Sequence, residues 1–220
     1  MCIIIHNPEG KPVNPSHLRN AYANNPDGFG VMWCDPTSGK IDTSQGLFSF
    51  EAITDILKEL RGIPHAIHFR FRTQGIISAE MTHPFRILKK EDDGTELWMM
   101  HNGTFTFPNM EENKSDSAIF AEKFRPIIKD LGTDVLFDNV HPRRLGERLG
   151  ENNRVLFMRG DGKVSILNSQ MGFIENGMWF SNQYSLKENY RIDKAKEKAN
   201  KASKLQIPRM SAPMVWPKLL

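Results

Sequence analysis

The hydrophobic positions of this chain fall into short runs separated by turn residues, with a few longer stretches of helical periodicity. Short apolar runs bounded by Gly, Pro, Asn or Asp are typical of β-strands. Such runs occupy 2–6, 29–35, 64–71, 96–102, 154–159, 163–168 and 177–181. Asp161-Gly162 and Asn176-Gly177 adjoin these runs and predict hairpin turns. The pattern therefore predicts antiparallel strand pairing.

Helical spacing predicts helices over the stretches 15–24, 49–61, 115–131 and 142–150. Ser16 is a candidate N-cap for the first of them. The apolar face of the second consists of Ala52, Ile53, Ile56, Leu57 and Leu60. The mixture of strands, hairpins and helices indicates the α+β class with large antiparallel sheets.

The composition is that of one globular domain followed by a C-terminal segment of different charge. The chain has 220 residues, of which 39% are hydrophobic and 25% charged, enough for one substantial core. No stretch approaches the ~20 apolar residues that cross a bilayer, and we find no secretory signal, so we expect a cytoplasmic location. Cys2 and Cys34 are too few for a disulfide framework, and we expect both to be reduced.

The net charge of +3 is unevenly distributed along the chain. Residues 186–220 hold nine Lys and Arg against three Asp and Glu, which leaves a net charge of −3 for residues 1–185. We therefore expect a domain over 1–185 and a basic, Pro-containing tail over 186–220. A solvated helix is expected from Ser185 to Leu205. Nucleic-acid contact is not expected, except that an electrostatic contact through the basic tail stays open.

The second residue carries the most specific chemistry of the chain. Removal of Met1 would leave Cys2 with a free α-amine, and this amine titrates near pH ~8 while a thiol titrates near ~8.5. One residue would then hold both a nucleophile and its base. The alternative is a buried first strand with an inert thiol, because Ile3, Ile4 and Ile5 follow. The histidines show no HExxH motif and the cysteines no CxxC pair, so we predict no metal and no cofactor.

Two further segments offer groups that could hold a charged substrate. If the strand 64–71 continues, His68, Arg70, Arg72 and Gln74 alternate onto one face. Arg70 could then bind a carboxylate with two hydrogen bonds, whereas a surface ion pair is the alternative, especially for Arg72.

Asn102-Gly103 ends another predicted strand. Its side-chain amide and backbone N–H could face a developing oxyanion, and the alternative is a simple turn. Ser115-Asp116-Ser117 opens the third predicted helix, where a capping role is the alternative to ligand binding.

Taken in this order, the motifs resemble the glutaminase domain of class II glutamine amidotransferases, which belong to the N-terminal-nucleophile hydrolases. The resemblance covers about residues 1–185 and implies a four-layer αββα sandwich of two mainly antiparallel sheets. The motifs are Met1-Cys2, Asp27-Gly28-Phe29-Gly30, His68-Phe69-Arg70 with Thr73 and Gly75, His83-Pro84-Phe85, His101-Asn102-Gly103, Ser115-Asp116-Ser117 and Phe180-Ser181-Asn182.

The resemblance implies a role for each candidate site residue. Cys2 would attack the side-chain amide of L-glutamine, with its α-amine as base, to release ammonia and form a thioester that water hydrolyses to glutamate. Asn102 and the Gly103 N–H would stabilise the oxyanion. The substrate-binding residues would be Arg70 and Thr73 for the α-carboxylate, Asp116 for the α-ammonium, and His83.

Arg72 and Gln74 depart from the family pattern, in which a small residue and often a histidine flank the threonine. They make an amidase for another γ-glutamyl or amide compound a second hypothesis. Only 35 residues follow Ser185, so we expect ammonia to pass to a separate synthase partner. A third hypothesis is an inactive fold that serves as a binding module.

Overall fold

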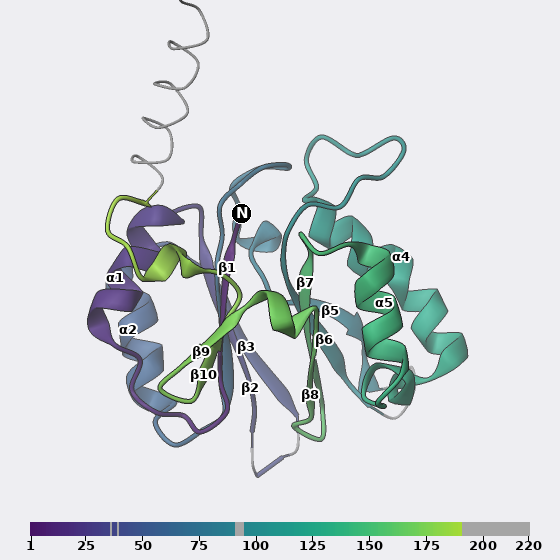
Figure 1. Ribbon diagram of the computed structural model, residues 1–220, viewed down its shortest axis with the longest axis horizontal. Coiled ribbons are helices and arrows are strands. Elements are labelled where there is room, and N and C mark those ends of the chain that lie inside the picture. Colours follow the sequence, from purple (N-terminus) through teal and green to yellow (C-terminus); the bar gives the residue numbers. More distant parts are fainter. Residues whose placement is uncertain (36, 39, 91–94, 191–220) are drawn as a thin grey trace, which may run out of the picture. The chain divides into compact units, whose positions relative to one another are not determined.

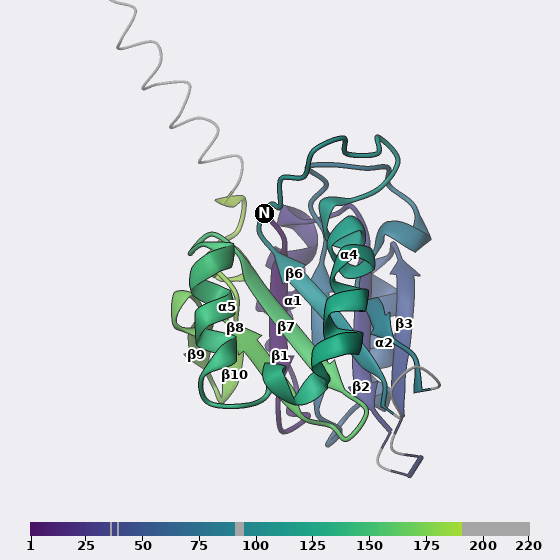
Figure 2. The same ribbon diagram turned by 90° about the vertical axis from the view of Figure 1, so that its right-hand side faces the viewer.

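Two antiparallel sheets lie face to face between two pairs of helices (Figures 1 and 2). The computed structural model describes residues 1–35, 37–38, 40–90 and 95–190. Residues 1–188 form one compact unit, and residues 189–220 are grouped separately. Within the first unit the layers are helix, sheet, sheet and helix. The predicted α+β class and the αββα layering that the resemblance implies are confirmed.

The first sheet has six strands in the order β3-β2-β4-β1-β10-β9, with antiparallel neighbours throughout. The bounds are β1 Ile3–Asn7, β2 Phe29–Cys34, β3 Ile41–Leu47, β4 His65–Phe69, β9 Phe173–Glu175 and β10 Met178–Phe180. β1 is a central strand, between β4 and β10, with Ile3 opposite Phe69 and Ile5 opposite Phe180. This position explains its uninterrupted apolar sequence, and it fixes Cys2 at the end of a strand that is bonded on both sides.

The second sheet has four strands in the order β5-β6-β7-β8, also antiparallel. The bounds are β5 Phe85–Leu88, β6 Leu97–Asn102, β7 Arg154–Arg159 and β8 Val164–Leu167. A cluster of buried side chains from both sheets, including Ile4, Met32, Met100 and Leu156, fills the space between them. Since Ile4 faces the second sheet, Ile3 and Ile5 face the other way.

Helices α1 (Pro15–Asn24) and α2 (Phe50–Glu59) cover the outer face of the first sheet. Tyr22 of α1 stacks on Phe29 of β2, with ring centroids 5.0 Å apart. Helices α4 (Asp116–Leu131) and α5 (His141–Leu149) cover the second sheet. Phe120 and Phe124 of α4 belong to the core between this sheet and its helices. Short 3₁₀ turns occur at Ala79–Met81, Thr133–Leu136, Ser169–Met171 and Gln183–Ser185.

Most predicted elements are confirmed, and the differences have local causes. The Asn14 side chain caps α1, accepting from the Ser16 backbone N–H at 2.9 Å, so Ser16 is not the cap. The strand predicted over 64–71 ends at Phe69. Strands β3, β5 and β9 were not predicted. Both hairpins are present, with Asn176 and Gly177 at positive φ between β9 and β10.

Two further expectations concern the C-terminal helix and the crossing of membranes. Most of the helix expected from Ser185 to Leu205 lies outside the described residues. Among the described residues, no helix combines the length and the apolar character needed to cross a bilayer.

Candidate active site

Cys2 is half-buried at the start of β1, and its backbone is held on both sides. The Asn25 side-chain amide donates to the Met1 carbonyl at 3.0 Å and to the Phe69 carbonyl at 3.1 Å. The Asn182 amide donates to the Cys2 carbonyl at 2.6 Å. The main chain next to the thiol is therefore fixed by two asparagine side chains. One of them, Asn182, is 180 residues away from Cys2 in the sequence.

The electrostatic surroundings of Cys2 connect it to two other candidate residues. Burial is the main influence and raises the pKa of the Cys2 thiol. A hydrogen bond to the Phe71 carbonyl, the charge of the Met1 α-amine and Arg70 act in the opposite direction, whereas Asp116 adds to the increase. Arg70 and Asp116 are thus close enough for their charges to act on the sulfur, although they lie far apart in the sequence.

Arg70 directly follows β4 and is buried, with 3% of its surface exposed. Its guanidinium donates to the Ile76 carbonyl at 2.7 Å and the Gln74 carbonyl at 3.1 Å. These bonds fold the chain after Phe69 into a loop, which is why the strand ends there and the predicted alternation stops. The remaining guanidinium N–H groups make no hydrogen bond within the described residues, so the side chain keeps donors for an anion.

Two other polar residues of this loop are exposed to solvent, in contrast to the buried Arg70. Thr73 is exposed, and its predicted contact with a carboxylate stays a prediction. Arg72 is also exposed, and its backbone N–H donates to the Asp27 carboxylate at 2.7 Å. Asp27 in turn donates its backbone N–H to the Arg70 carbonyl at 3.1 Å.

Asn102 is the last residue of β6 and is completely buried. Its Nδ2 donates to Ser181 Oγ at 2.9 Å, and the same oxygen accepts the backbone N–H of Ile4 at 2.8 Å. Ser181 thus joins Asn102 to the strand that carries Cys2. The second N–H of the Asn102 amide makes no hydrogen bond within the described residues, and Oδ1 has no partner there either. This geometry leaves a donor for a developing oxyanion.

Gly103 is held in a network that has no room for a side chain. A Cβ at this position would overlap Asn153 Oδ1 and lie 2.7 Å from His101 Nε2. Asn153 Oδ1 accepts from the Thr104 N–H at 3.0 Å and lies 2.9 Å from His101 Nε2. Since this oxygen can only accept, His101 carries its proton on Nε2 and accepts the Ser117 hydroxyl on Nδ1 at 2.8 Å.

Asp116 is the first residue of α4 and is buried, with 6% exposed. One carboxylate oxygen accepts the Phe105 N–H at 2.7 Å, and the other accepts the Ser117 N–H at 2.9 Å. Ser115 caps the helix, with its hydroxyl accepting from Ala118 at 3.2 Å. Both the cap predicted for this tripeptide and a carboxylate near Cys2 are therefore present. The positive end of the helix stabilises the charge of Asp116.

His83 lies in the interior, stacked on His68 with ring centroids 3.8 Å apart. His68 donates from Nε2 to the His101 carbonyl at 3.0 Å, so its Nδ1 is unprotonated. Burial lowers the pKa of His68 to about 3 and that of His83 well below its usual value. Both rings are therefore neutral at physiological pH. The predicted substrate-binding role of His83 stays a prediction.

Several solved structures resemble the chain, among them the following two. One is described as glutamine phosphoribosylpyrophosphate (PRPP) amidotransferase from B. subtilis complexed with ADP and GMP, with 14% identity and a TM-score of 0.44. The other is described as the structure of the allosteric regulatory enzyme of purine biosynthesis, with 16% identity and a TM-score of 0.43. The alignments cover 84% of this chain but only 42% of each structure. No family model and no curated protein match the sequence.

Several residues of this site were not assigned roles from the sequence. The sequence shows Ser181 and Asn182 only as part of a late motif, and local patterns do not specify their contacts with Asn102 and Cys2. Asn25 precedes the motif that begins at Asp27. Ser181 and Asn182 are short polar residues directly after an apolar strand sequence, which is the signal that could have indicated buried hydrogen bonding. Asn25 lies at the end of a helix and offers no such signal.

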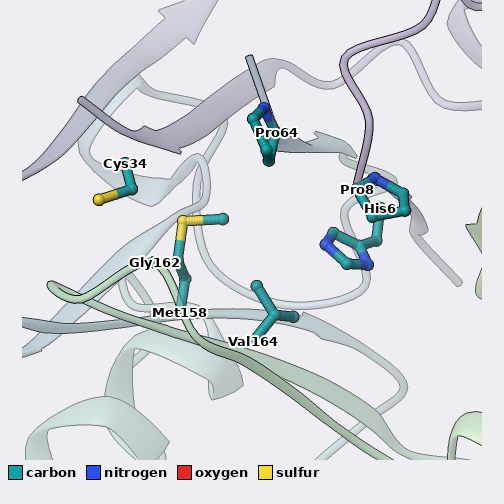
Figure 3. A pocket seen from close by; sticks show the side chains of 7 residues that line it. All are labelled: His6, Pro8, Cys34, Pro64, Met158, Gly162 and Val164. Atoms are coloured by element: carbon teal, nitrogen blue, oxygen red, sulfur yellow. The ribbon is translucent and has the colours of Figure 1, made fainter. Parts of the chain in front are cut away.

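The second cysteine lies in different surroundings. Cys34, at the end of β2, lines a mostly apolar pocket of about 440 Å³ together with His6 and Met158 (Figure 3). His6 belongs to the end of β1 opposite Cys2. Burial and nearby carboxylates raise the pKa of the Cys34 thiol. Both cysteines are free, and the described residues contain no cluster of three or more His, Cys, Asp or Glu side chains that could hold a metal ion.

Proposed function

We propose that this chain is a glutamine amidotransferase-type glutaminase with Cys2 as its nucleophile. The observation that supports the proposal is that three separate elements supply groups linked to the start of β1 by charge or by hydrogen bonds. Cys2 at the start of β1 lies within electrostatic reach of Arg70 and Asp116, and Ser181 links Asn102 to the same strand. This combination suits a substrate with an α-carboxylate, an α-ammonium and a neutral side-chain amide.

The reaction would begin with removal of Met1, which frees the α-amine of Cys2. This amine accepts the thiol proton, and the sulfur attacks the amide carbon of L-glutamine. Asn102 Nδ2 and the Gly103 N–H donate to the oxyanion, each interaction being worth about 3 kcal/mol in comparable sites. The C–N bond breaks, and the nitrogen leaves as ammonia after taking the proton from the α-amine.

A glutamyl thioester then remains on Cys2. The same amine takes a proton from a water molecule, whose oxygen attacks the thioester carbon and displaces the sulfur. The products are L-glutamate and the free thiol, so one glutamine and one water yield one glutamate and one ammonia. Arg70 and Asp116 hold the charged end of the substrate throughout. Ammonia passes to a separate synthase in this account.

Glutamate release measured on matched cysteine variants tests the proposal. Protein with Met1 removed, checked by intact mass, should release glutamate from L-glutamine. Cys2→Ala should abolish this release, whereas Cys34→Ala should retain it. Cys34 ends β2 and lines a pocket with His6, near the end of β1 opposite Cys2. Equal hydrolysis by wild type and Cys2→Ala would contradict the mechanism.

A second candidate is an amidase for a larger γ-glutamyl compound. The exposed Arg72 supports it, because its charge acts on Arg70 and could meet an additional anionic group of a substrate. Comparing kcat/KM for L-glutamine and γ-glutamyl dipeptides distinguishes the two. A dipeptide preference that Arg72→Ala removes would favour the amidase, and a preference for free glutamine would exclude it.

A further inference from the structure

An apolar groove is lined by residues of α4, of the 3₁₀ turn Thr133–Leu136 and of α5. Figure 2 shows the two helices on the outer face of the second sheet. The groove encloses about 450 Å³. Its lining consists of Phe124, Ile127, Ile128, Leu131, Val135, Leu136, His141, Arg144, Leu145 and Arg148. Seven of these ten side chains are apolar, and the other three are basic or imidazole groups. The lining therefore combines apolar contact area with positive charge.

The α4 side of the groove exposes large aliphatic side chains. Ile127 is 50% exposed and Leu131 is 62% exposed. They are four residues apart and so lie on one face of the helix. Phe124 and Ile128 beside them are buried, at 7% and 1% exposure, and belong to the core. The groove thus has a packed base and an exposed apolar edge. Surfaces of this kind bind aliphatic side chains of a partner protein.

The α5 side supplies cations that lack acidic partners. Arg144 and Arg148 are exposed, four residues apart, and form no ion pair with the described residues. Three carboxylates near this helix are paired with other groups. These pairs are Asp134 with Arg159, Asp138 with His141, and Glu147 with Arg143. Because no carboxylate is among the lining residues, the groove presents two free guanidinium groups beside its apolar edge.

We propose that this groove binds an acidic amphipathic helix of a separate protein. The stretch from Phe124 to Leu131 is about two turns, or roughly 10 Å, which matches apolar anchors spaced three and four residues apart on a partner helix. Aspartate or glutamate side chains next to those anchors would form two-point hydrogen bonds with Arg144 and Arg148.

Charge argues against the two alternative occupants. Residues 191–220 of this chain contain eight Lys and Arg but only two Asp and Glu, so they would be repelled by the arginines. A second copy packed about a two-fold axis would bring the same arginines together. A partner with carboxylates avoids both conflicts. The proposal does not depend on the chemistry of Cys2.

Binding of a synthetic peptide to the full chain tests the proposal. The probe is a fluorescein-labelled amphipathic peptide of about 14 residues, with Leu at every third and fourth position and Glu flanking them. The control peptide carries Lys in place of Glu. We expect the Glu peptide to raise its anisotropy on titration with the protein, at least about tenfold more tightly than the Lys peptide, with an affinity that falls as salt is added.

Matched variants assign the binding to the groove. Leu131→Glu and Arg144→Glu should each weaken binding of the Glu peptide by about tenfold or more. Two control variants should leave it within about twofold: Ile174→Asp, at a 75% exposed position on β9, and Arg61→Glu, an exposed position just after α2. Far-ultraviolet circular dichroism checks that each variant is folded.

Three results would overturn the proposal. These are a Glu peptide that does not bind, binding that Leu131→Glu and Arg144→Glu leave unchanged, and equal binding of the Lys peptide. Sedimentation of the unliganded protein provides a fourth check. A dimer that Leu131→Glu converts to a monomer would assign the groove to a second copy of the chain instead.

Discussion

The hydroxyl of Ser181 provides the sharpest test of how the candidate site is assembled. Ser181 is completely buried, and its oxygen accepts hydrogen bonds from the Ile4 N–H at 2.8 Å and from Asn102 Nδ2 at 2.9 Å. Ser181→Ala removes this oxygen and little else. The substitution should therefore change both the free energy of unfolding and the orientation of the Asn102 amide.

The size of each effect follows from these two bonds. A buried donor that loses its acceptor costs about 1–3 kcal/mol, so two donors give roughly 3 kcal/mol with partial relaxation. For a chain of this length that loss lowers Tm by roughly 6–12 °C. Complete loss of the Asn102 donor in Asn102→Ala should reduce kcat about 100-fold. Ser181→Ala keeps the amide but frees its rotation, and we expect about a tenfold reduction, or about 1.4 kcal/mol.

Urea unfolding and steady-state glutamate release measure the two effects on the same protein. KM should stay within about twofold, because Arg70 and Asp116 hold the charged end of the substrate. Ser185→Ala is the matched control, since Ser185 is equally buried but its hydroxyl has no hydrogen-bond partner among the described residues. It should change the free energy of unfolding by no more than about 0.5 kcal/mol.

A double variant separates positioning from general damage. If Ser181 acts through Asn102, the kcat of Ser181→Ala combined with Asn102→Ala should equal that of Asn102→Ala alone. A destabilised Ser181→Ala with unchanged kcat would refute the positioning role. Independent, multiplying losses in the double variant would refute it as well.

Further predictions concern close packing and buried histidines. Gly103→Ala should lower the free energy of unfolding by about 1–3 kcal/mol and reduce glutamate release, because the added Cβ overlaps Asn153 Oδ1; unchanged urea unfolding would contradict this. Gly30→Ala should destabilise similarly, because its Cβ overlaps the His83 carbonyl, and a native-like Tm would contradict it. The pKa of His68 is lowered to about 3, so the unfolded chain binds one more proton below pH ~6.5. Stability should therefore fall as pH drops from ~6.5 towards 3, by up to about 1.4 kcal/mol per pH unit for this residue. Urea unfolding at about pH 7.5 and about pH 5 checks the sign, and equal stabilities would contradict it.

The sequence predicted the buried strands and the helices well because their side-chain patterns reflect burial directly. Ile3, Ile4 and Ile5 belong to a central strand, and their run is apolar because both faces are covered. β3 was missed because it is an edge strand whose residues are mostly polar and partly exposed. β9 has only three residues, too few for a periodic signal.

The candidate site was predictable as a set of residue types but not as a set of contacts. The sequence predicted that Arg70 and Asp116 offer opposite charges, and in the structure the charges of both act on the Cys2 thiol. The sequence also predicted that Arg70 lies within a strand, and this prediction was wrong. The strand ends at Phe69, and the Arg70 guanidinium donates to the carbonyls of Gln74 and Ile76 in the loop that follows. The bond from Ser181 to Ile4 spans 177 residues and depends on how the strands pair, which local patterns do not specify.

Mass spectrometry of the acid-quenched reaction tests the central claim most directly. Protein with Met1 removed is mixed with L-glutamine, quenched in acid and digested, and the peptide that contains Cys2 is examined. The account predicts an added glutamyl group in thioester linkage on Cys2, absent from Cys2→Ala and never found on Cys34. Glutamate release without any acyl group on Cys2, or with one on Cys34, would contradict it.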